Sequence, residues 1–260
     1  MEIIEKVIVM DTETANTLDD PIVYDIGWAV VDYMGNVYET CSYIVADIFY
    51  DREFMNTAYY KDKIPQYERD ILNNKRTIKS YAQVRAKFSE IVKKWGIKKV
   101  FAHNMPFDYR SVNTTLRWIT SSKQRYFFPY GMEICDTLLM ARQALKGDED
   151  YKHFCEENAF LTKAGKPQFT AEVLYRYIIN NPQYEEEHTA LEDVLIEKEI
   201  LTYCLKIKPD VEIHLWKEER QKKEDETEKK EEPVKPKRKR KPRTKKEETV
   251  IDNHPTAKIW

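Results

Sequence analysis

Two acidic residues follow the first apolar run of the chain directly. The segment VIVMDTETAN, residues 7–16, places Asp11 and Glu13 two positions apart. Residues i and i+2 of an extended strand point to the same side, so both carboxylates are expected to project together. At roughly 5–7 Å, two like charges repel by a few kcal/mol at an effective dielectric near 20. A divalent cation, which prefers carboxylate oxygen, would remove that repulsion; the alternative is a solvated strand end.

Three further titratable residues extend this pattern. FAHNMPFDYR places Asp108 a few residues after an expected strand, and EEEHTALEDVLIEKEIL contains His188 and Asp193. If the second segment is helical, its leucines and Val194 form one apolar stripe, and Asp193 lies roughly 130° away from it. Asp193 is therefore predicted to face a cleft. His188 is too far round the helix to share that face, so we expect it in the loop that enters the helix; a surface histidine is the alternative.

The three segments together resemble a known family. VMDTETA, AHNMPFD and EHTALEDV occur in this order and are similar to the three motifs of the DEDDh 3′–5′ exonucleases, which include the proofreading epsilon subunit of bacterial DNA polymerase III and ribonuclease T-like enzymes. The His-x4-Asp spacing separates this subfamily from its tyrosine variant. YDIGWAVVD and CDTLLMAR resemble two further stretches of the family, and the resemblance covers about residues 5–206.

The resemblance implies a fold, a cofactor and a role for each of these residues. The expected fold is ribonuclease H-like, and the expected cofactor is a pair of divalent ions, Mg²⁺ or Mn²⁺. Asp11 would bridge both ions, Glu13 and Asp193 would complete the first metal site, and Asp108 would hold the second. His188 would be the catalytic base that takes the proton from the attacking water.

Residues next to these motifs are expected to bind the substrate: Thr12, Thr14, Asn104 and Phe107. The threonines offer hydroxyl or backbone donors, although ordinary strand-end polar residues are the alternative. Phe107 could stack on a base, since any base has an aromatic face, or it could simply pack. Many relatives read Thr-Gly after the first motif where this chain has Ala15 and Asn16, which leaves the preference for DNA or RNA open.

The expected function is hydrolysis of single-stranded DNA from its 3′ end to nucleoside 5′-monophosphates, in replication proofreading or repair. The expected partners are single-stranded DNA or RNA 3′ ends and a separate polymerase or replisome protein bound through the C-terminal tail. Two alternatives stay open: a 3′–5′ exoribonuclease in RNA trimming or turnover, and a non-catalytic nucleic-acid-binding replisome adaptor.

The pattern of apolar residues predicts the elements that position these motifs. Strands are expected at 6–10, 22–32 and 37–45, and a strand at 98–104 follows a helix at 80–96. The rest of the domain is predicted to contain a helix at 109–120, a strand running into a helix at 132–145, and helices at 169–181 and 190–205. Residues 46–78 have no clean period and are predicted to be irregular or partly helical. This order implies an α/β fold with a mixed sheet, three antiparallel strands and then parallel strands, flanked by helices.

Charge divides the chain into an exonuclease-like domain, residues 1–210, and a charged tail, residues 211–260. From residue 217 onward there are sixteen Lys and Arg against eleven Asp and Glu, a net of +5; the whole chain carries −2, so residues 1–216 carry −7. The tail has little to bury and is expected to be largely disordered. Its basic block, 233–246, suits phosphate binding, a nuclear localisation signal or solubilisation.

The remaining composition favours a soluble intracellular protein. The four cysteines are widely spaced, which predicts free thiols rather than a disulfide framework or a zinc ribbon. The chain shows no signal segment and no apolar run that would span a membrane. A cytoplasmic location in a bacterial or bacteriophage-infected cell is expected, and the basic tail would also suit a nucleus.

Overall fold

The computed structural model describes residues 5–123 and 125–213. Every described residue belongs to one compact unit of the chain. The basic block at 233–246 and the rest of the expected disordered tail from residue 214 onward lie outside the described residues, whereas Val211, the first residue of that expected tail, is buried in the core. No helix of the described part is long and apolar enough to cross a membrane.

A mixed six-stranded sheet forms the centre of the described unit, in the order β4-β3-β2-β1-β5-β6. β1 pairs antiparallel with β2 and β2 with β3, whereas β1–β5, β5–β6 and β3–β4 are parallel. The strands are β1 (Lys6–Ala15), β2 (Ile22–Asp32), β3 (Val37–Val45), β4 (Thr77–Lys79), β5 (Lys99–Ala102) and β6 (Glu133–Asp136). The predicted fold class, antiparallel strands followed by parallel ones, is confirmed.

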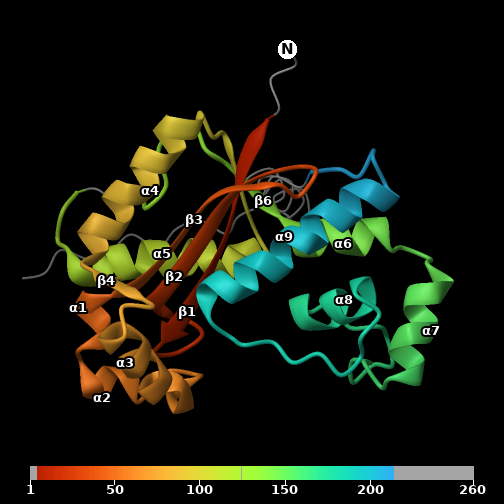
Figure 1. Ribbon diagram of the computed structural model, residues 1–260, viewed down its shortest axis with the longest axis horizontal. Coiled ribbons are helices and arrows are strands. Elements are labelled where there is room, and N and C mark those ends of the chain that lie inside the picture. Colours follow the sequence, from red (N-terminus) through yellow and green to blue (C-terminus); the bar gives the residue numbers. More distant parts are fainter. Residues whose placement is uncertain (1–4, 124, 214–260) are drawn as a thin grey trace, which may run out of the picture. The chain divides into compact units, whose positions relative to one another are not determined.

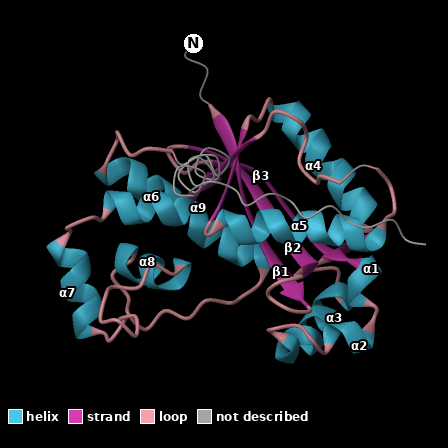
Figure 2. Cartoon of the chain, turned by 180° about the vertical axis from the view of Figure 1, so that it is seen from behind, coloured by secondary structure: helices cyan, strands magenta, loops and turns pink. Residues whose placement is uncertain are grey.

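Helices cover both faces of the sheet. In Figure 1, α9 (Ala190–Ile207) crosses in front of the strands, and Figure 2 shows α5 (Met105–Ile119) across the opposite face. Side chains of β1 alternate accordingly: Val7 and Val9 pack with Val194 of α9, while Ile8 and Met10 join the larger core beside α5. β2 is buried along its whole length, because both of its faces are covered.

The remaining helices pack around this frame. They are α4 (Tyr81–Trp95), α6 (Thr137–Ala144), α7 (Glu149–Glu157) and α8 (Ala171–Ile178). The sequence signals at two helix ends are confirmed: α4 begins with a capping box of Ser80 and Gln83 and ends at Gly96 in the left-handed conformation, and Thr170 caps α8. All four cysteines are free and buried, as predicted.

Several predicted boundaries were wrong. β1 continues to Ala15 instead of ending at residue 10, because β2 pairs with it along that whole length. α5 begins at Met105, with Pro106 in its first turn, so Asp108 lies inside the helix. α7 and β4 were not predicted. The apolar stripe predicted for α9 is also partly wrong: Leu195 is 39% exposed, whereas Ile196 and Ile200 are buried in a separate cluster with α6, α7 and α8.

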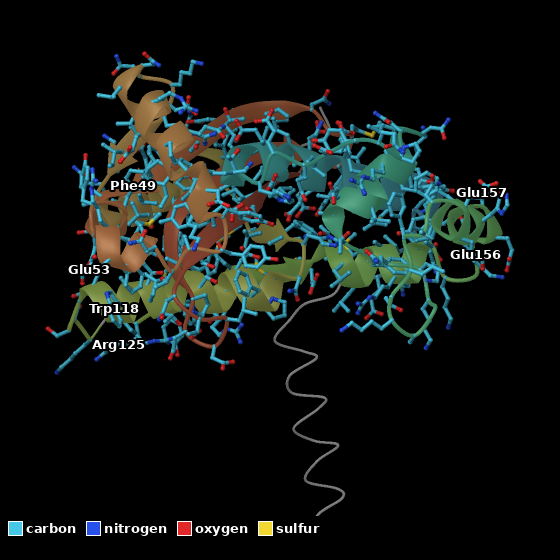
Figure 3. The ribbon with its side chains drawn as sticks, turned by 90° about the horizontal axis from the view of Figure 1, so that it is seen from below. Phe49, Glu53, Trp118, Arg125, Glu156 and Glu157 are labelled. Atoms are coloured by element: carbon cyan, nitrogen blue, oxygen red, sulfur yellow. The ribbon has the colours of Figure 1, made fainter. Side chains whose placement is uncertain are left out.

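The segment between β3 and β4, here called the excursion, is partly helical as predicted. It contains α1 (Ala46–Phe49), α2 (Arg52–Met55), a 3-10 turn η1 (Lys61–Lys63) and α3 (Ile64–Leu72). Figure 3 shows its Phe49 and Glu53 at the same end of the described unit as Trp118 of α5, with Glu156 and Glu157 of α7 at the other end. The Phe54 ring contacts Trp118 at 5.6 Å between centroids.

Candidate active site

The first-motif carboxylates lie on the α9 face of β1, beyond the end of β5. β5 pairs with β1 only at Ile8 and Val9, so Asp11 and Glu13 follow the last parallel bridge. Asp193, in the first turn of α9, faces them, and the ligand oxygens of Asp11, Glu13 and Asp193 all lie within 4.8 Å of one another. The structure thus brings together three of the four predicted metal ligands directly.

A close contact between β2 and α9 fixes the height of Asp193 above the sheet. A Cβ atom added at Gly27 would come within 2.7 Å of the backbone of Ala190 and Leu191. Beside it, the Asp25 carboxylate accepts a hydrogen bond from the Ala190 backbone N–H at 3.2 Å. The Asp-Ile-Gly stretch of β2 therefore holds the first turn of α9, and with it the third motif, against the sheet.

Asp108 lies beside the other face of β1, outside the close group of Asp11, Glu13 and Asp193. Thr12 points toward α5, and its hydroxyl donates to Asp108 Oδ1 at 2.7 Å. Asp108 is 2% exposed and has a pKa raised to about 7, chiefly by burial. The Thr12 hydroxyl, predicted to meet the substrate, is here engaged with the second-motif carboxylate.

Burial, and repulsion by neighbouring carboxylates, raise the pKa of every carboxyl in this group. For Asp11 burial is the largest cause, followed by the charges of Asp108 and Glu197. Burial and then Asp193 raise the pKa of Glu13, and burial and then Glu186 raise that of Asp193 to about 8. Asp193 Oδ1 is buried and has no hydrogen-bond partner among the described residues. Carboxylates in this state either hold protons or face a cation.

Glu197 is a further buried carboxylate that sequence reasoning missed. It lies one turn after Asp193 on α9, is 3% exposed, and its Oε2 accepts the backbone N–H of His103 at 3.0 Å. Burial and the charges of Asp108 and Asp193 raise its pKa well above the usual value. The signal was present in the sequence, because residues four apart on a helix share a face.

His188 lies in the loop before α9, as predicted. Its backbone is left-handed, with φ of 49°, and its side chain is partly exposed. Nδ1 is 3.6 Å from Glu186 Oε2, and the imidazole stacks on Tyr60 with ring centroids 4.4 Å apart and planes 11° apart. Burial, and then the charge of Lys63, lower the pKa of His188, which favours the neutral imidazole. Neither Tyr60 nor Glu186 carries a sequence signal.

A cavity of about 430 Å³ opens in front of these residues, a volume typical of ligand pockets. One wall carries Asp11, Glu13, Asp193 and Glu197, and Tyr60 and His188 also line the space. Further lining residues come from α8 and the segment before it: Phe160, Gln168, Thr170, Ala171, Glu172, Val173 and Arg176. The cavity therefore combines an acidic wall with a mixed polar and apolar one.

The other residues predicted to bind substrate lie around this cavity without lining it. Asn104 is exposed, has a left-handed backbone and precedes α5. Phe107 is half-buried, with the Arg110 guanidinium 5.8 Å from its ring centroid. Thr14 is half-buried in β1, next to the register shift that follows Glu13.

Asn16 follows the first-motif strand with a left-handed backbone conformation. Its φ is 73°, a conformation open to glycine and, among other residues, mainly to asparagine and aspartate. Its N–H donates to Thr57 Oγ1 of the excursion at 2.7 Å, and its side-chain amide donates to the Asp20 carbonyl at 2.9 Å. The backbone N–H of Asn16 thus ties this turn to the excursion.

Comparison with solved structures finds the same fold in exonucleases. An exonuclease I in complex with the inhibitor BCBP superposes with a TM-score of 0.53 at 15% identity, and exonuclease I from Methylocaldum szegediense with 0.51 at 16%. The zinc-bound complex of E. coli exonuclease I with single-stranded DNA gives 0.50 at 16%. Each match covers 80% of this chain and 42% of the other. No protein-family model and no curated protein matches the chain.

These likenesses establish the ribonuclease H-like fold. The chain spans about two fifths of the length of the exonuclease I structures, so the segments of those enzymes beyond this domain have no counterpart in the superposition. Identities of 15–16% leave the chemistry to be inferred from the site itself.

Proposed function

We propose that this protein is a metal-dependent 3′–5′ exonuclease that hydrolyses single-stranded DNA from its 3′ end and releases nucleoside 5′-monophosphates, in replication proofreading or repair. The observation that carries the proposal is the convergence of Asp11, Glu13 and Asp193 beside a histidine with a lowered pKa, in a cavity open to solvent. The shared fold with exonuclease I, whose complexes hold single-stranded DNA, supports the substrate class.

The residues present fit a pair of divalent cations. Their donors are carboxylate oxygens, which Mg²⁺ and Mn²⁺ prefer, and Asp193 Oδ1 is buried without a partner. Asp11, Glu13 and Asp193 would hold one ion, and Asp108, positioned by Thr12, would hold a second together with Asp11. When bound, such ions neutralise the scissile phosphate, orient it and make the attacking water more acidic.

The protein's own residues supply the proton transfer. His188 is neutral near pH 7 because burial lowers its pKa, so it can accept the proton of the attacking water. Its Nδ1 faces Glu186, which leaves Nε2 as the nitrogen for that proton. His188 lies in a segment without regular secondary structure, with φ of 49°, so neighbouring side chains must orient its imidazole.

Incubation of the full chain with Mg²⁺ or Mn²⁺ and 5′-labelled oligonucleotides tests the proposal. Single-stranded DNA, single-stranded RNA and a mismatched duplex are compared, with Asp11→Ala as the inactive control. A ladder that shortens one nucleotide at a time from the 3′ end of DNA is expected. Preferential cleavage of RNA would make the protein an exoribonuclease, and binding without cleavage of any substrate would favour a nucleic-acid-binding adaptor.

A further inference from the structure

The excursion between β3 and β4 brings an aromatic ring onto the proposed catalytic base. Tyr60, the residue before η1, lies parallel to the His188 imidazole at 4.4 Å between centroids and 11° between planes. It also lines the cavity that contains the carboxylates. The two rings are 128 positions apart in the sequence, so this contact exists only because the excursion folds back to the end of β1.

The excursion is fixed to the sheet on both sides of Tyr60. Before it, Thr57 Oγ1 accepts the N–H of Asn16 at 2.7 Å, directly after β1. After it, the Tyr67 hydroxyl donates to Asp25 Oδ2 of β2 at 2.8 Å. Tyr59 packs edge-on against Tyr60 at 4.9 Å. Tyr60 is therefore held by the same two strands that carry the first motif and support α9.

His188 needs such support more than the carboxylates do. Asp11 and Glu13 belong to a strand and Asp193 to a helix, whereas residues 185–189 have no regular secondary structure. The two side chains placed to orient the imidazole are Glu186 beside Nδ1 and Tyr60 on its face. The face of Tyr60 that meets His188 is closed to a substrate base.

We propose that Tyr60 is a positioning residue: its ring fixes the plane of the His188 imidazole, and Glu186 fixes which nitrogen faces the cavity. This inference rests on the proposed function for its kinetic consequence. It gives the excursion, which sequence reasoning left without a role, a specific task in the active site. Aligning a catalytic group before reaction lowers the entropic part of the barrier, so loss of the stack acts on turnover more than on binding.

The kinetic test compares Tyr60→Phe, which keeps the stack, with Tyr60→Leu, which removes it; Tyr130→Leu, at a fully exposed tyrosine before β6, is the control. Tyr60→Leu is expected to lower kcat roughly tenfold to a hundredfold. Its KM for a DNA oligonucleotide and its Mn²⁺ affinity, measured by calorimetry, should stay within about twofold of the wild-type values. Tyr60→Phe and Tyr130→Leu should match the wild type. An effect confined to KM, or an equal loss in Tyr60→Phe, would overturn the proposal.

A double-mutant cycle separates positioning from substrate contact. In the His188→Ala background, Tyr60→Leu should cause no further loss of kcat, because the ring it aligns is gone. A full additional loss would assign Tyr60 to the substrate instead.

An NMR measurement that needs no catalysis tests the Tyr60–His188 stack separately from the proposed nuclease function. The imidazole protons of His188 in the wild-type protein, assigned by their disappearance in His188→Ala, should show an upfield ring-current shift in NMR spectra. Tyr60→Phe should keep that shift. An unshifted His188 signal in the wild type would refute the stack even if the protein is an active nuclease. A shifted signal in an inactive protein would instead refute the nuclease function alone.

Discussion

Two buried acidic clusters flank the first turn of α9, and they are built in opposite ways. In the first, here called the paired cluster, Asp25 lies 3.7 Å from the Arg76 guanidinium and accepts from Tyr67 and the Ala190 backbone. Arg76 also forms ion pairs with Asp70 and Glu192. In the second, the unpaired cluster of Asp11, Glu13, Asp108, Asp193 and Glu197, none of the carboxylates forms an ion pair within the described residues.

The difference separates a structural from a functional use of buried charge. The paired cluster joins the excursion, β2 and α9. Its positive charge is the Arg76 guanidinium, which folding brings next to the carboxylates. All carboxylates of the unpaired cluster except Asp108 line the cavity, and the pKa values of Asp11 and Glu13 lie well above normal. Folding leaves its charge uncompensated, which suits ligands for cations from solution. Substitutions in the first should harm stability, and those in the second activity.

Asp11→Asn should have the largest effect on activity and should leave the fold intact. Losing the carboxylate common to both proposed metal sites removes several kcal/mol of charge stabilisation, so cleavage of single-stranded DNA should fall by about a thousandfold or more. The metal-free protein should melt no lower than the wild type, because a repelling charge is gone. Rates and melting curves in EDTA measure both, with exposed Asp19→Asn as the control. Substantial remaining activity would remove Asp11 from the site.

Arg76→Met should have the largest effect on stability. The Arg76 side chain is 7% exposed, and removing one partner of a buried ion pair typically costs about 3–5 kcal/mol. Urea unfolding should therefore show a large drop in the free energy of unfolding, and Asp25→Asn in the same chain should recover part of it. If Arg76→Met cost less than about 1 kcal/mol, the paired cluster would not hold the excursion in place.

The pH dependence of stability should report on the raised pKa values of the unpaired cluster when metal is removed; Asp25 of the paired cluster, whose pKa burial raises to about 6, adds a contribution of the same sign at lower pH. The pKa values of Asp108, about 7, and Asp193, about 8, lie above their unfolded values, so the folded state retains protons that the unfolded state releases. Their contribution is present below about pH 4 and is lost as pH rises toward 8, by up to about 1.4 kcal/mol per pH unit for each proton retained. Urea unfolding in EDTA at pH 5 to 8 measures this slope.

Asp193→Asn should flatten that slope, and saturating Mn²⁺ should reverse the loss at pH 8. Metal binding to the folded state alone adds about 2.7 kcal/mol when the free ion is at 100 times its Kd. Equal slopes for the wild type and Asp193→Asn would contradict the raised pKa of this carboxyl.

The sequence could predict the site residues that occur in short motifs, but not those that depend on contacts between distant segments. Asp11 and Glu13 on a strand, and His188 entering a helix with Asp193, follow from spacing alone, and the structure brings the three acids together. Tyr60 could not be predicted, because its place depends on hydrogen bonds between the excursion and residues far away in the sequence, such as Asn16.

The error in the apolar stripe of α9 also comes from contacts between distant segments. The α9 stripe was assigned as if one face were buried, yet α9 packs on the sheet with Val194 and on α6, α7 and α8 with Ile196. A helix buried on two sides has no single apolar stripe, and its polar positions carry more information than its apolar ones. Asp193 and Glu197, the buried acids of α9, could have been read in that way.

Glu197→Gln should have the smallest effect and refines the boundary of the unpaired cluster. The amide keeps an oxygen for the His103 N–H, so packing is preserved while one negative charge next to Asp11 is lost. Stability in EDTA should rise by up to about 1 kcal/mol, and Mn²⁺ affinity by calorimetry should fall roughly threefold to tenfold. Glu199→Gln, more exposed on the same helix, is the control. Unchanged Mn²⁺ affinity would show that Glu197 is buried only for packing and that its charge does not contribute to cation binding.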